Sequence, residues 1–330
     1  MEYKSLSRKG DRIMKKRCIV ALGMICSLGI VFFSFAWGAD YPTKPINLVV
    51  GAAPGGPLDT HARILGEVAG KELGVPMVII NKAGPGGALA ASSVANEKPD
   101  GYSYLVTSSS TMTANFAIFP NLSYKRTDLI PVFMSMLVPI TIAVRTESPY
   151  KNLKELLDAA KKNPGKIRSG SYSPTISLVW EGLLKQEKLD VTHMMYKGAS
   201  EAFVAVMGGH IDCYLEGLTP LIPQIDAGKV RLLAFIGSKR YKHYPDVPTL
   251  KELGYSSFSR DFWSGFYAPA GLPTPIRDKI VPVFEKALSL PSVQAQMEKA
   301  GVLAQFMGPR EFADFVDEQY NFFMGLAKQK

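Results

Sequence analysis

The sequence predicts an α/β protein of two domains, each built on a mainly parallel sheet flanked by helices. Short apolar runs alternate with segments in which apolar residues recur at helical spacing, a pattern typical of parallel sheets with helical crossovers. Two successive strand-to-helix connections carry Pro-Gly-Gly, at residues 54–56 and 85–87. A chain of 330 residues is also long enough to divide into two such domains.

The segment before the first domain has the features of a secretory signal peptide. Lys15, Lys16 and Arg17 precede an uncharged apolar stretch, residues 19–35, which small residues follow. We therefore expect residues 1–38 to be removed by cleavage near Ala36 to Ala39, with Met14 as an alternative start, and the mature chain to reach the periplasm. The competing interpretation is an uncleaved anchor, because about 17 apolar residues lie at the lower limit of a membrane span.

Composition argues against several classes of function. Without residues 1–38 the chain keeps 31 basic and 27 acidic residues, so its net charge falls from +9 to +4, too mild and scattered for a nucleic-acid-binding protein. Cys213 then stands alone, and its place between Asp212 and Tyr214 in an apolar run predicts a small buried side chain. The four histidines are not spaced as metal ligands, and the sequence contains neither Cys-x-x-Cys nor Gly-x-Ser-x-Gly. We therefore expect no metal, no cofactor and no enzymatic activity, although a Ser-His pair distant in sequence stays open.

The first domain begins with two strand-loop-helix units. Residues 46–50 form a strand, and the loop 52–56 leads into a helix whose apolar face comprises Leu58, Ala62, Leu65, Ala69 and Leu73. A second strand, 75–80, passes through residues 81–87 into a helix over 88–95. The third strand, 104–107, runs into four consecutive hydroxyl residues, 108–111.

The connection between the domains is predicted in the apolar stretch 130–144. Pro131 and Pro139 interrupt it, which suits strands that pass from one domain to the other better than a helix. A helix over 152–162, a strand near Ile167, a helix over 175–185 and strands at 191–196, 211–215 and 230–236 follow. Residues 262–268 read as a returning strand, before helices over 275–289, 292–300 and 309–327. We expect one domain from residues 39–135 with 265–330 and the other from 136–264, with hinges at 131–144 and 263–268.

The glycine-rich loops suit an anion. Glycines let the backbone approach a ligand closely, and the first turn of the following helix offers free N–H groups and a partial positive charge. Neither loop has the Lys of a P-loop or the Gly-x-Gly-x-x-Gly of a dinucleotide fold, and Asp59 would repel a polyphosphate. Asp59 itself has two interpretations. Its negative charge either complements the positive end of the helix, or it accepts a hydrogen bond from a donor group on the ligand.

Several motifs in their order along the chain carry a resemblance to a known family. They are Tyr41-Pro42-x-Lys44-Pro45-Ile46, Ala53-Pro54-Gly55-Gly56-x-x-Asp59, Asn81-Lys82-Ala83-Gly84-Pro85-Gly86-Gly87 and Pro245-Asp246-Val247-Pro248-Thr249. With them the chain resembles, over nearly its whole mature length, the receptors of tripartite tricarboxylate transporters, also called the Bug family. The resemblance implies a monomeric, two-domain periplasmic binding protein of type II-like fold, which closes its interdomain cleft on a small organic carboxylate and delivers it to membrane transporter subunits.

Two other roles stay open beside transport. One is ligand sensing with a signalling partner. The other is an exported enzyme that acts on a carboxylate, for which Asp59 and Asp212 would have to face each other.

The resemblance also implies which residues contact the ligand. They come from the first loop, the hydroxyl segment, the loop after the first strand of the second domain, and one later strand: Ala52, Ala53, Gly55, Gly56, Leu58, Asp59; Ser108, Ser109, Thr111; Ser171, Tyr172, Ser173, Thr175; and Asp212. The chain departs from the family in two places. Gly51 and Ala52 replace the usual Pro-Phe and leave room for a larger ligand, and Ser177 stands where a His is usual. Tyr172 either contacts the ligand or covers the loop.

Overall fold

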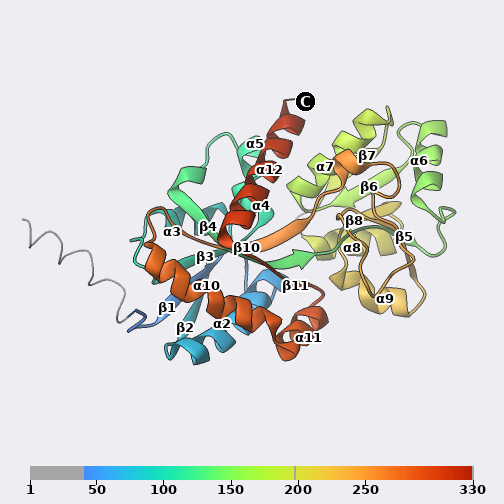
Figure 1. The fold of residues 1–330 in the computed structure, drawn as a ribbon. Helices are drawn as coiled ribbons and strands as arrows, with labels where there is room; N and C mark the ends of the chain where they lie inside the picture. The colour runs from blue at the N-terminus through green and yellow to red at the C-terminus, as the bar shows by residue number, and fades with distance from the viewer. Residues whose placement is uncertain (1–40, 197, 329–330) are drawn as a thin grey trace, which may run out of the picture. The chain divides into compact units, whose positions relative to one another are not determined.

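The computed structural model describes residues 41–196 and 198–328, so the predicted signal peptide and its cleavage site lie outside the described residues. The compact unit Lys44–Lys330 contains two separate sheets with helices against them, which confirms the predicted α/β class (Figure 1). Both sheets are mixed, and each has its parallel strands on one side.

The first sheet has six strands in the order β11-β4-β10-β3-β1-β2. Their bounds are β1 Ile46–Val50, β2 Met77–Asn81, β3 Ser103–Ser108, β4 Leu129–Val138, β10 Phe262–Pro269 and β11 Leu303–Met307. Strands β2, β1 and β3 are parallel, whereas β10, β4 and β11 run antiparallel to their neighbours. The parallel half therefore carries the strand-loop-helix units that the sequence predicts.

Helices cover both faces of this sheet. On one face, α2 (Pro57–Leu73) and α10 (Thr274–Ser289) pack against residues such as Leu48, Phe133 and Phe266. On the other, α3 (Ala88–Ala95) and α12 (Pro309–Ala327) pack against Val49, Leu105 and Trp263. The other α-helices of this half are α4 Ser109–Met112, α5 Asn115–Ile118 and α11 Pro291–Lys299.

The second sheet has five strands in the order β7-β6-β8-β5-β9. Their bounds are β5 Ile140–Arg145, β6 Arg168–Ser171, β7 Thr192–Met195, β8 Cys213–Gly217 and β9 Val230–Phe235. Strands β7, β6 and β8 are parallel, and β5 is antiparallel to both β8 and β9. The helices of this half are α6 Leu153–Lys162, α7 Pro174–Gln186, α8 Ala199–Met207 and α9 Ile222–Asp226.

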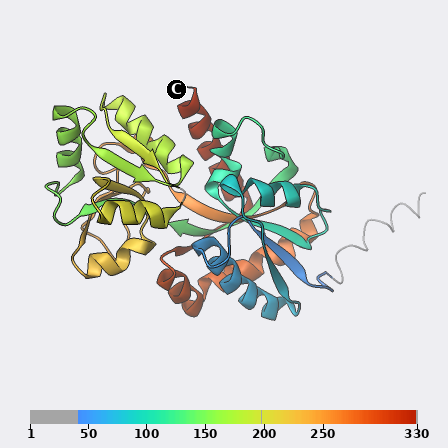
Figure 2. The ribbon, with the colours of Figure 1, turned by 180° about the vertical axis from the view of Figure 1, so that it is seen from behind.

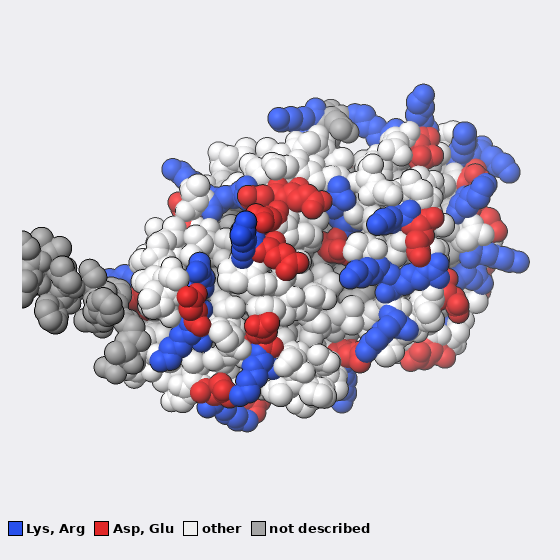
Figure 3. All heavy atoms as spheres, viewed as in Figure 1, with Lys and Arg blue, Asp and Glu red and all other residues white. Residues whose placement is uncertain are grey.

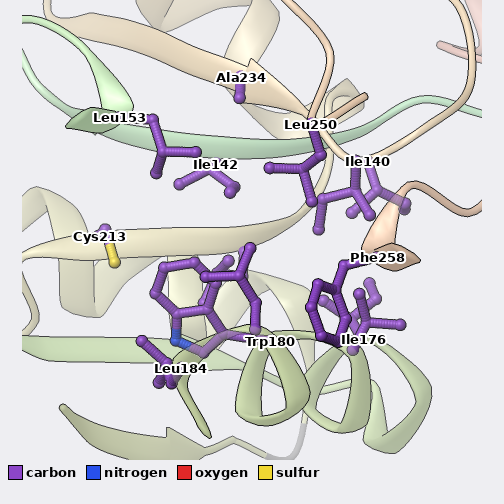
Figure 4. Packing of buried hydrophobic residues seen from close by; sticks show 14 of the residues in the cluster. Ile140, Ile142, Leu153, Ile176, Trp180, Leu184, Cys213, Ala234, Leu250 and Phe258 are labelled. Carbon is purple, nitrogen blue, oxygen red and sulfur yellow. The ribbon is translucent and has the colours of Figure 1, made fainter. Parts of the chain in front are cut away.

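The core of this half surrounds Trp180 of α7, whose side chain is 1% exposed. Side chains of β5, β8 and α6 pack with it, among them Ile142, Leu153 and Cys213 (Figure 4). Cys213 is a free, buried thiol, which confirms the predicted small buried side chain, and burial raises its pKa. Phe323 and Leu326 of α12 belong to the same cluster, so the last helix also packs against α7 (Figure 2).

Two strands connect the halves at their centre. Strand β4 ends at Val138, and after Pro139 the chain enters β5 in the second sheet. Pro131 lies inside β4 opposite Tyr267, next to a register shift that accommodates the missing N–H. The eight residues of β10 are all buried. The domain boundaries placed from the sequence stay a prediction.

The surface has no single dominant charge. Lys and Arg alternate with Asp and Glu over much of the face in Figure 3, as the mild net charge predicts. Within residues 41–196 and 198–328, none of the helices combines the length and the apolar character that a membrane crossing requires.

Candidate functional site

Three loops gather at the carboxyl edge of the parallel strands of the first sheet. Val50 is in register with Asn81 of β2 and with Val106 of β3, so the three strands end side by side. The first loop (51–56), the second loop (82–87) and the hydroxyl segment (108–111) all begin at this edge. Ligands bind at the carboxyl ends of strands in open α/β sheets, so this edge is the candidate site.

Asp59 fixes the shape of the first loop. It is 2% exposed, and its Oδ2 accepts hydrogen bonds from the Gly55 amide at 2.8 Å and from Arg63 Nε at 2.9 Å. Asn81 Nδ2 donates to Asp59 Oδ1 at 2.9 Å and to the Ala52 carbonyl at 3.0 Å. Burial alone would raise the pKa of Asp59, but these hydrogen bonds and the Arg63 charge lower it to about 2. The ionised carboxylate therefore acts within the protein, and contact between it and a ligand stays a prediction.

The first loop leaves the start of α2 open. Gly56 caps the helix and Pro57 has no N–H, and among residues 41–196 and 198–328 no side chain caps the first-turn amides. Residues 53–55 are exposed, and Gly56 and Leu58 are half-buried. Gly55 has φ +83°, and a Cβ there would meet nothing within 4 Å. An accessible loop with free amides and a positive helix end suits an anion.

The second Pro-Gly-Gly loop packs inward. The Gly86 carbonyl accepts hydrogen bonds from Thr111 Oγ1 at 2.7 Å and Asn115 Nδ2 at 2.8 Å. Gly87 has φ +75°, and a Cβ there would lie 2.7 Å from Thr111 Oγ1 and 2.9 Å from Thr107 Oγ1. Its glycines therefore serve close packing against β3 and α4, which the sequence did not distinguish from ligand binding.

The hydroxyl segment divides into buried and accessible side chains. Thr111 is fully buried, with Oγ1 also 2.5 Å from Thr107 Oγ1, and Ser109 is 5% exposed. Ser108 and Ser110 are half-buried, and their Oγ atoms lie 2.9 Å apart. Ser110, absent from the predicted ligand residues, therefore reaches the surface where Thr111 does not.

The loop before α7 is the counterpart in the second sheet, and it encloses a glutamate. The Tyr172 and Ser173 amides each donate to Glu216 Oε1 at 2.8 Å. Glu216 lies near the carboxyl end of β8, the neighbour of β6, and is 2% exposed. Burial raises the pKa of its carboxyl to about 8, although the amides of Ser173, Tyr172 and Gly217 oppose the shift. Sequence reasoning missed this residue, whose signal is a single carboxylate in the apolar run 213–217.

A network of buried serine hydroxyls and the half-buried imidazole of His193 lies next to this loop. Ser171 Oγ lies 2.6 Å from Ser177 Oγ, which lies 2.8 Å from His193 Nε2, and His193 Nδ1 lies 2.9 Å from Ser169 Oγ. At Ser177, where the resemblance implies a His, the side chain lies beside the imidazole of His193 on β7. Ser169 and Ser171 are fully buried, and Ser177 is 5% exposed. The Ser-His contact that the sequence left open thus exists inside the protein, without an exposed serine.

Two other predicted ligand residues differ in their surroundings. Thr175, in the first turn of α7, is 1% exposed, and its Oγ1 has no hydrogen-bond partner among the described residues. Asp212 precedes β8 at the amino edge of the sheet, where its Oδ2 accepts from the Arg168 amide at 2.8 Å. The structure therefore does not bring Asp212 together with Tyr172 and Ser173, because they lie at opposite ends of parallel strands.

The parallel strands of both sheets end next to the segments that connect the two halves, which are β4 with β5 and β10. We call these the crossing strands. Ser108 at the end of β3 pairs with Ser264 of β10, which pairs with Met136 of β4. Four residues further along the chain, Ile140 of β5 pairs with Gly217 at the end of β8. Four extended residues span about 13 Å. The hydroxyl segment and the Glu216 loop thus flank the same short stretch of chain.

Two cavities lie elsewhere. One of about 650 Å³ is bordered by Arg63, Lys71 and Met77 on α2 and β2, and one of about 320 Å³ by Met134, Phe235 and other residues near the crossing strands. Neither includes a predicted ligand residue. In the part of the chain that the structure describes, no group of three or more His, Cys, Asp or Glu side chains is arranged to hold a metal ion.

Comparison with known proteins finds the same architecture. The family described as tripartite tricarboxylate transporter family receptor matches residues 61–329. A UPF0065 protein from the gbd 5' region of Cupriavidus necator is 32% identical over 313 residues, which cover 92% of this chain and 94% of that protein. The periplasmic binding protein BugD has a TM-score of 0.73 at 32% identity, covering 88% of this chain and 98% of BugD. MatC of Rhodopseudomonas palustris, solved with bound malate, has a TM-score of 0.72 at 29% identity. The match covers 87% of this chain and 100% of the MatC chain.

Proposed function

This chain belongs to the tripartite tricarboxylate transporter receptor family, and from that premise we propose that it captures a small organic carboxylate in the periplasm and delivers it to a membrane transporter. The family is one of solute-binding receptors, and MatC, a structure of this fold, holds malate. We extend the carboxylate class to this chain without naming the acid.

The open start of α2 carries the proposal. Its amides have no side-chain cap from any residue that the structure describes, and residues 53–55 of the preceding loop are exposed. Hydrogen bonds to Asp59 and Asn81 hold that loop in place without a ligand. A loop already in its binding shape lowers the entropy cost of binding. A carboxylate there would accept hydrogen bonds from the first-turn amides and benefit from the helix dipole.

Capture would then involve movement of the two halves about the crossing strands. We place the hinges at 131–144 and 263–268, between a domain of residues 39–135 with 265–330 and a domain of residues 136–264. A ligand that contacts both domains only in the closed form shifts the equilibrium toward closure. The packing of Leu326 of α12 against α7 would limit how far the halves separate.

A matched pair of variants at Gly56 tests the site. Gly56 has φ −78°, and a Cβ there would meet only the Ala53 carbonyl, at 3.8 Å, so side chains fit. Gly56→Asp places a carboxylate where the ligand's carboxylate is expected, while Gly56→Asn adds nearly the same volume without charge. Both residues cap helices well, so folding should be preserved.

The purified protein is first screened by thermal shift against mono-, di- and tricarboxylic and aromatic acids, and the affinity of the best acid is measured by calorimetry. Either side-chain oxygen can occupy the first-turn amides, so both variants should bind the acid more weakly than wild type does. The added charge should make Gly56→Asp at least about tenfold weaker than Gly56→Asn. Equal affinity of wild type and Gly56→Asp would contradict the site. Cellular uptake of the same acid, with and without the gene, tests delivery to a transporter.

A further inference from the structure

The two halves also touch each other directly, beside the crossing strands. Glu298 lies in α11 of the first half, and its Oε1 is 2.9 Å from Nζ of Lys242, which follows β9 in the second half. The same carboxylate contacts Nε2 of His243. These two contacts, the one with Lys242 most, lower the pKa of Glu298, so the carboxylate is charged near neutral pH.

Close packing continues this contact along the chain. Gly301 has φ +75°, and a Cβ there would overlap the side chain of Thr219, which follows β8. Leu303 begins β11 and packs against a buried cluster of the second half that contains Phe235 and Tyr241. A charged contact and an apolar contact thus join the halves at the same place.

Strand order separates this place, which we call the rear contact (residues 298–303 with 218–243), from the predicted ligand loops. In the first sheet β11 is the neighbour of β4, while the first loop follows β1, beyond β10 and β3. In the second sheet β9 is the neighbour of β5, while the loop before α7 follows β6, beyond β8. A rotation about the crossing strands that brings the ligand loops together therefore moves the two sides of the rear contact apart.

In this structure the rear contact is formed and the ligand loops are accessible. Phe235 and Tyr241 are 2% and 4% exposed, whereas residues 53–55 of the first loop are exposed and Tyr172 is 44% exposed. The rear contact thus belongs to the open form of the protein.

We propose that the rear contact stabilises the open form and thereby sets the affinity for the acid from outside the binding site. The inference rests on the proposed function, in which the halves close on the acid. When only the closed form binds tightly, the apparent affinity falls in proportion to the fraction of closed protein. Weakening the rear contact should raise that fraction, and the affinity with it, although no residue of the site changes.

Charge reversal at Glu298 tests the contact. The side chains of Glu298, Lys242 and His243 are 29%, 68% and 50% exposed, so loss of the ion pair alone should have a small effect. Glu298→Lys adds repulsion from Lys242, and the double variant Lys242→Glu/Glu298→Lys restores an attractive pair with its charges exchanged. Glu285→Lys is the matched control, at an exposed glutamate of α10 without an ion pair among the described residues. Melting temperatures check that each variant is folded.

The first readout needs no acid. Spin labels at Leu89→Cys and Ser200→Cys report the distance between the halves, because both residues are exposed in the first turn of a helix that follows a parallel strand. The native thiol of Cys213 is buried. Pulsed electron paramagnetic resonance should show a larger share of short distances in Glu298→Lys than in wild type. The double variant and the control should have the wild-type distribution.

The second readout is calorimetry with malate, adipate, citrate and benzoate. Each of these acids that binds wild type should bind Glu298→Lys at least about threefold more tightly, and should bind the double variant and the control with wild-type affinity. Unchanged distances in Glu298→Lys, an equal or weaker affinity, or a double variant that behaves like Glu298→Lys would overturn the inference. If none of the four acids binds, the distances alone decide it, and the wider screen judges the proposed function.

Discussion

Asn81 Nδ2 donates to Asp59 Oδ1 at 2.9 Å and at the same time to the Ala52 carbonyl at 3.0 Å. Asp59 lies in the first turn of α2, and Asn81 is the last residue of β2, so one amide joins the first loop, the first helix and the second strand. This contact explains why a loop exposed at 53–55 has a defined shape.

Replacing Asn81 with Ala is expected to loosen the first loop. The variant loses the two hydrogen bonds that Nδ2 donates and the one that Oδ1 accepts from Arg63 at 3.3 Å. It leaves Asp59 Oδ1 and the Ala52 carbonyl without that donor, at a cost of about 1–3 kcal/mol in the free energy of unfolding. Urea denaturation measures it, and ligand affinity should fall in parallel. Arg63→Ala is the comparison, because the Arg63 side chain is 52% exposed and water can take its place beside Asp59, whereas no such replacement is open to the Asn81 amide inside the loop. A larger loss for Arg63→Ala than for Asn81→Ala would contradict this order.

Gly87 and Gly55 form a matched pair of glycines with positive φ, +75° and +83°. Both should pay a similar backbone cost on substitution by Ala, about 1–2 kcal/mol. A Cβ at Gly87 would also lie 2.7 Å from Thr111 Oγ1, whereas a Cβ at Gly55 meets nothing within 4 Å. We expect Gly87→Ala to destabilise the protein by about 1–3 kcal/mol more than Gly55→Ala in the same denaturation assay. Equal losses would show that the second loop is not tightly packed.

Removing the Thr175 hydroxyl should have opposite effects on the stability of the protein and on ligand affinity. Its buried Oγ1 has no partner among the described residues, and such a hydroxyl costs about 1–3 kcal/mol. Thr175→Val keeps the shape and removes the hydroxyl, so the melting temperature of the empty protein should rise. Ligand affinity should fall if the hydroxyl bonds the ligand, as the resemblance implies. Thr175→Ser, which keeps the hydroxyl, should retain affinity. A less stable Thr175→Val protein would contradict the first expectation.

Most elements could be predicted from the sequence because their periods and breakers are local. Pro309–Ala327 and Ala88–Ala95 match the predicted helices, and Gly74 ends α2 in the left-handed conformation that glycine favours. Strand β11 was missed, because Leu303–Met307 is a short run after a helix that gains its strand character by pairing with β4. Helix α8 was missed as well, since its small residues give little periodicity.

The site was harder to predict because the role of each charged residue depends on a hydrogen-bond partner that is distant in sequence. From the sequence, Asp59 is a charged residue after a glycine-rich loop and Asp212 is one before a strand. Their roles become clear only from the residues to which they form hydrogen bonds. Asp59 bonds to Asn81, 22 residues later, and Asp212 bonds to Arg168, 44 residues earlier. Glu216 binds the amide of Tyr172, also 44 residues away, and no local pattern announces such a contact.

The free energy of unfolding should depend on pH through the ionisation of Glu216. Burial raises its pKa in the folded protein from 4.5 to about 8. A raised folded pKa contributes stability that is fully present below the unfolded value and is lost as pH rises through the folded value. The Glu216 contribution should therefore decline between about pH 4.5 and pH 8, by at most about 1.4 kcal/mol for each pH unit.

Other groups change stability in part of the same range, so the comparison is with Glu216→Gln. Burial lowers the pKa of His61 from 6.5 to about 4, and its contribution, present above pH 6.5, is lost as pH falls toward 4. That effect has the opposite sign and cancels between wild type and Glu216→Gln. Denaturation from about pH 5 to pH 9 should show wild type losing stability relative to Glu216→Gln as pH rises, until about pH 8. A constant difference across this range would mean that the Glu216 carboxyl keeps an ordinary pKa in the folded protein, and that its amide contacts offset the cost of burial.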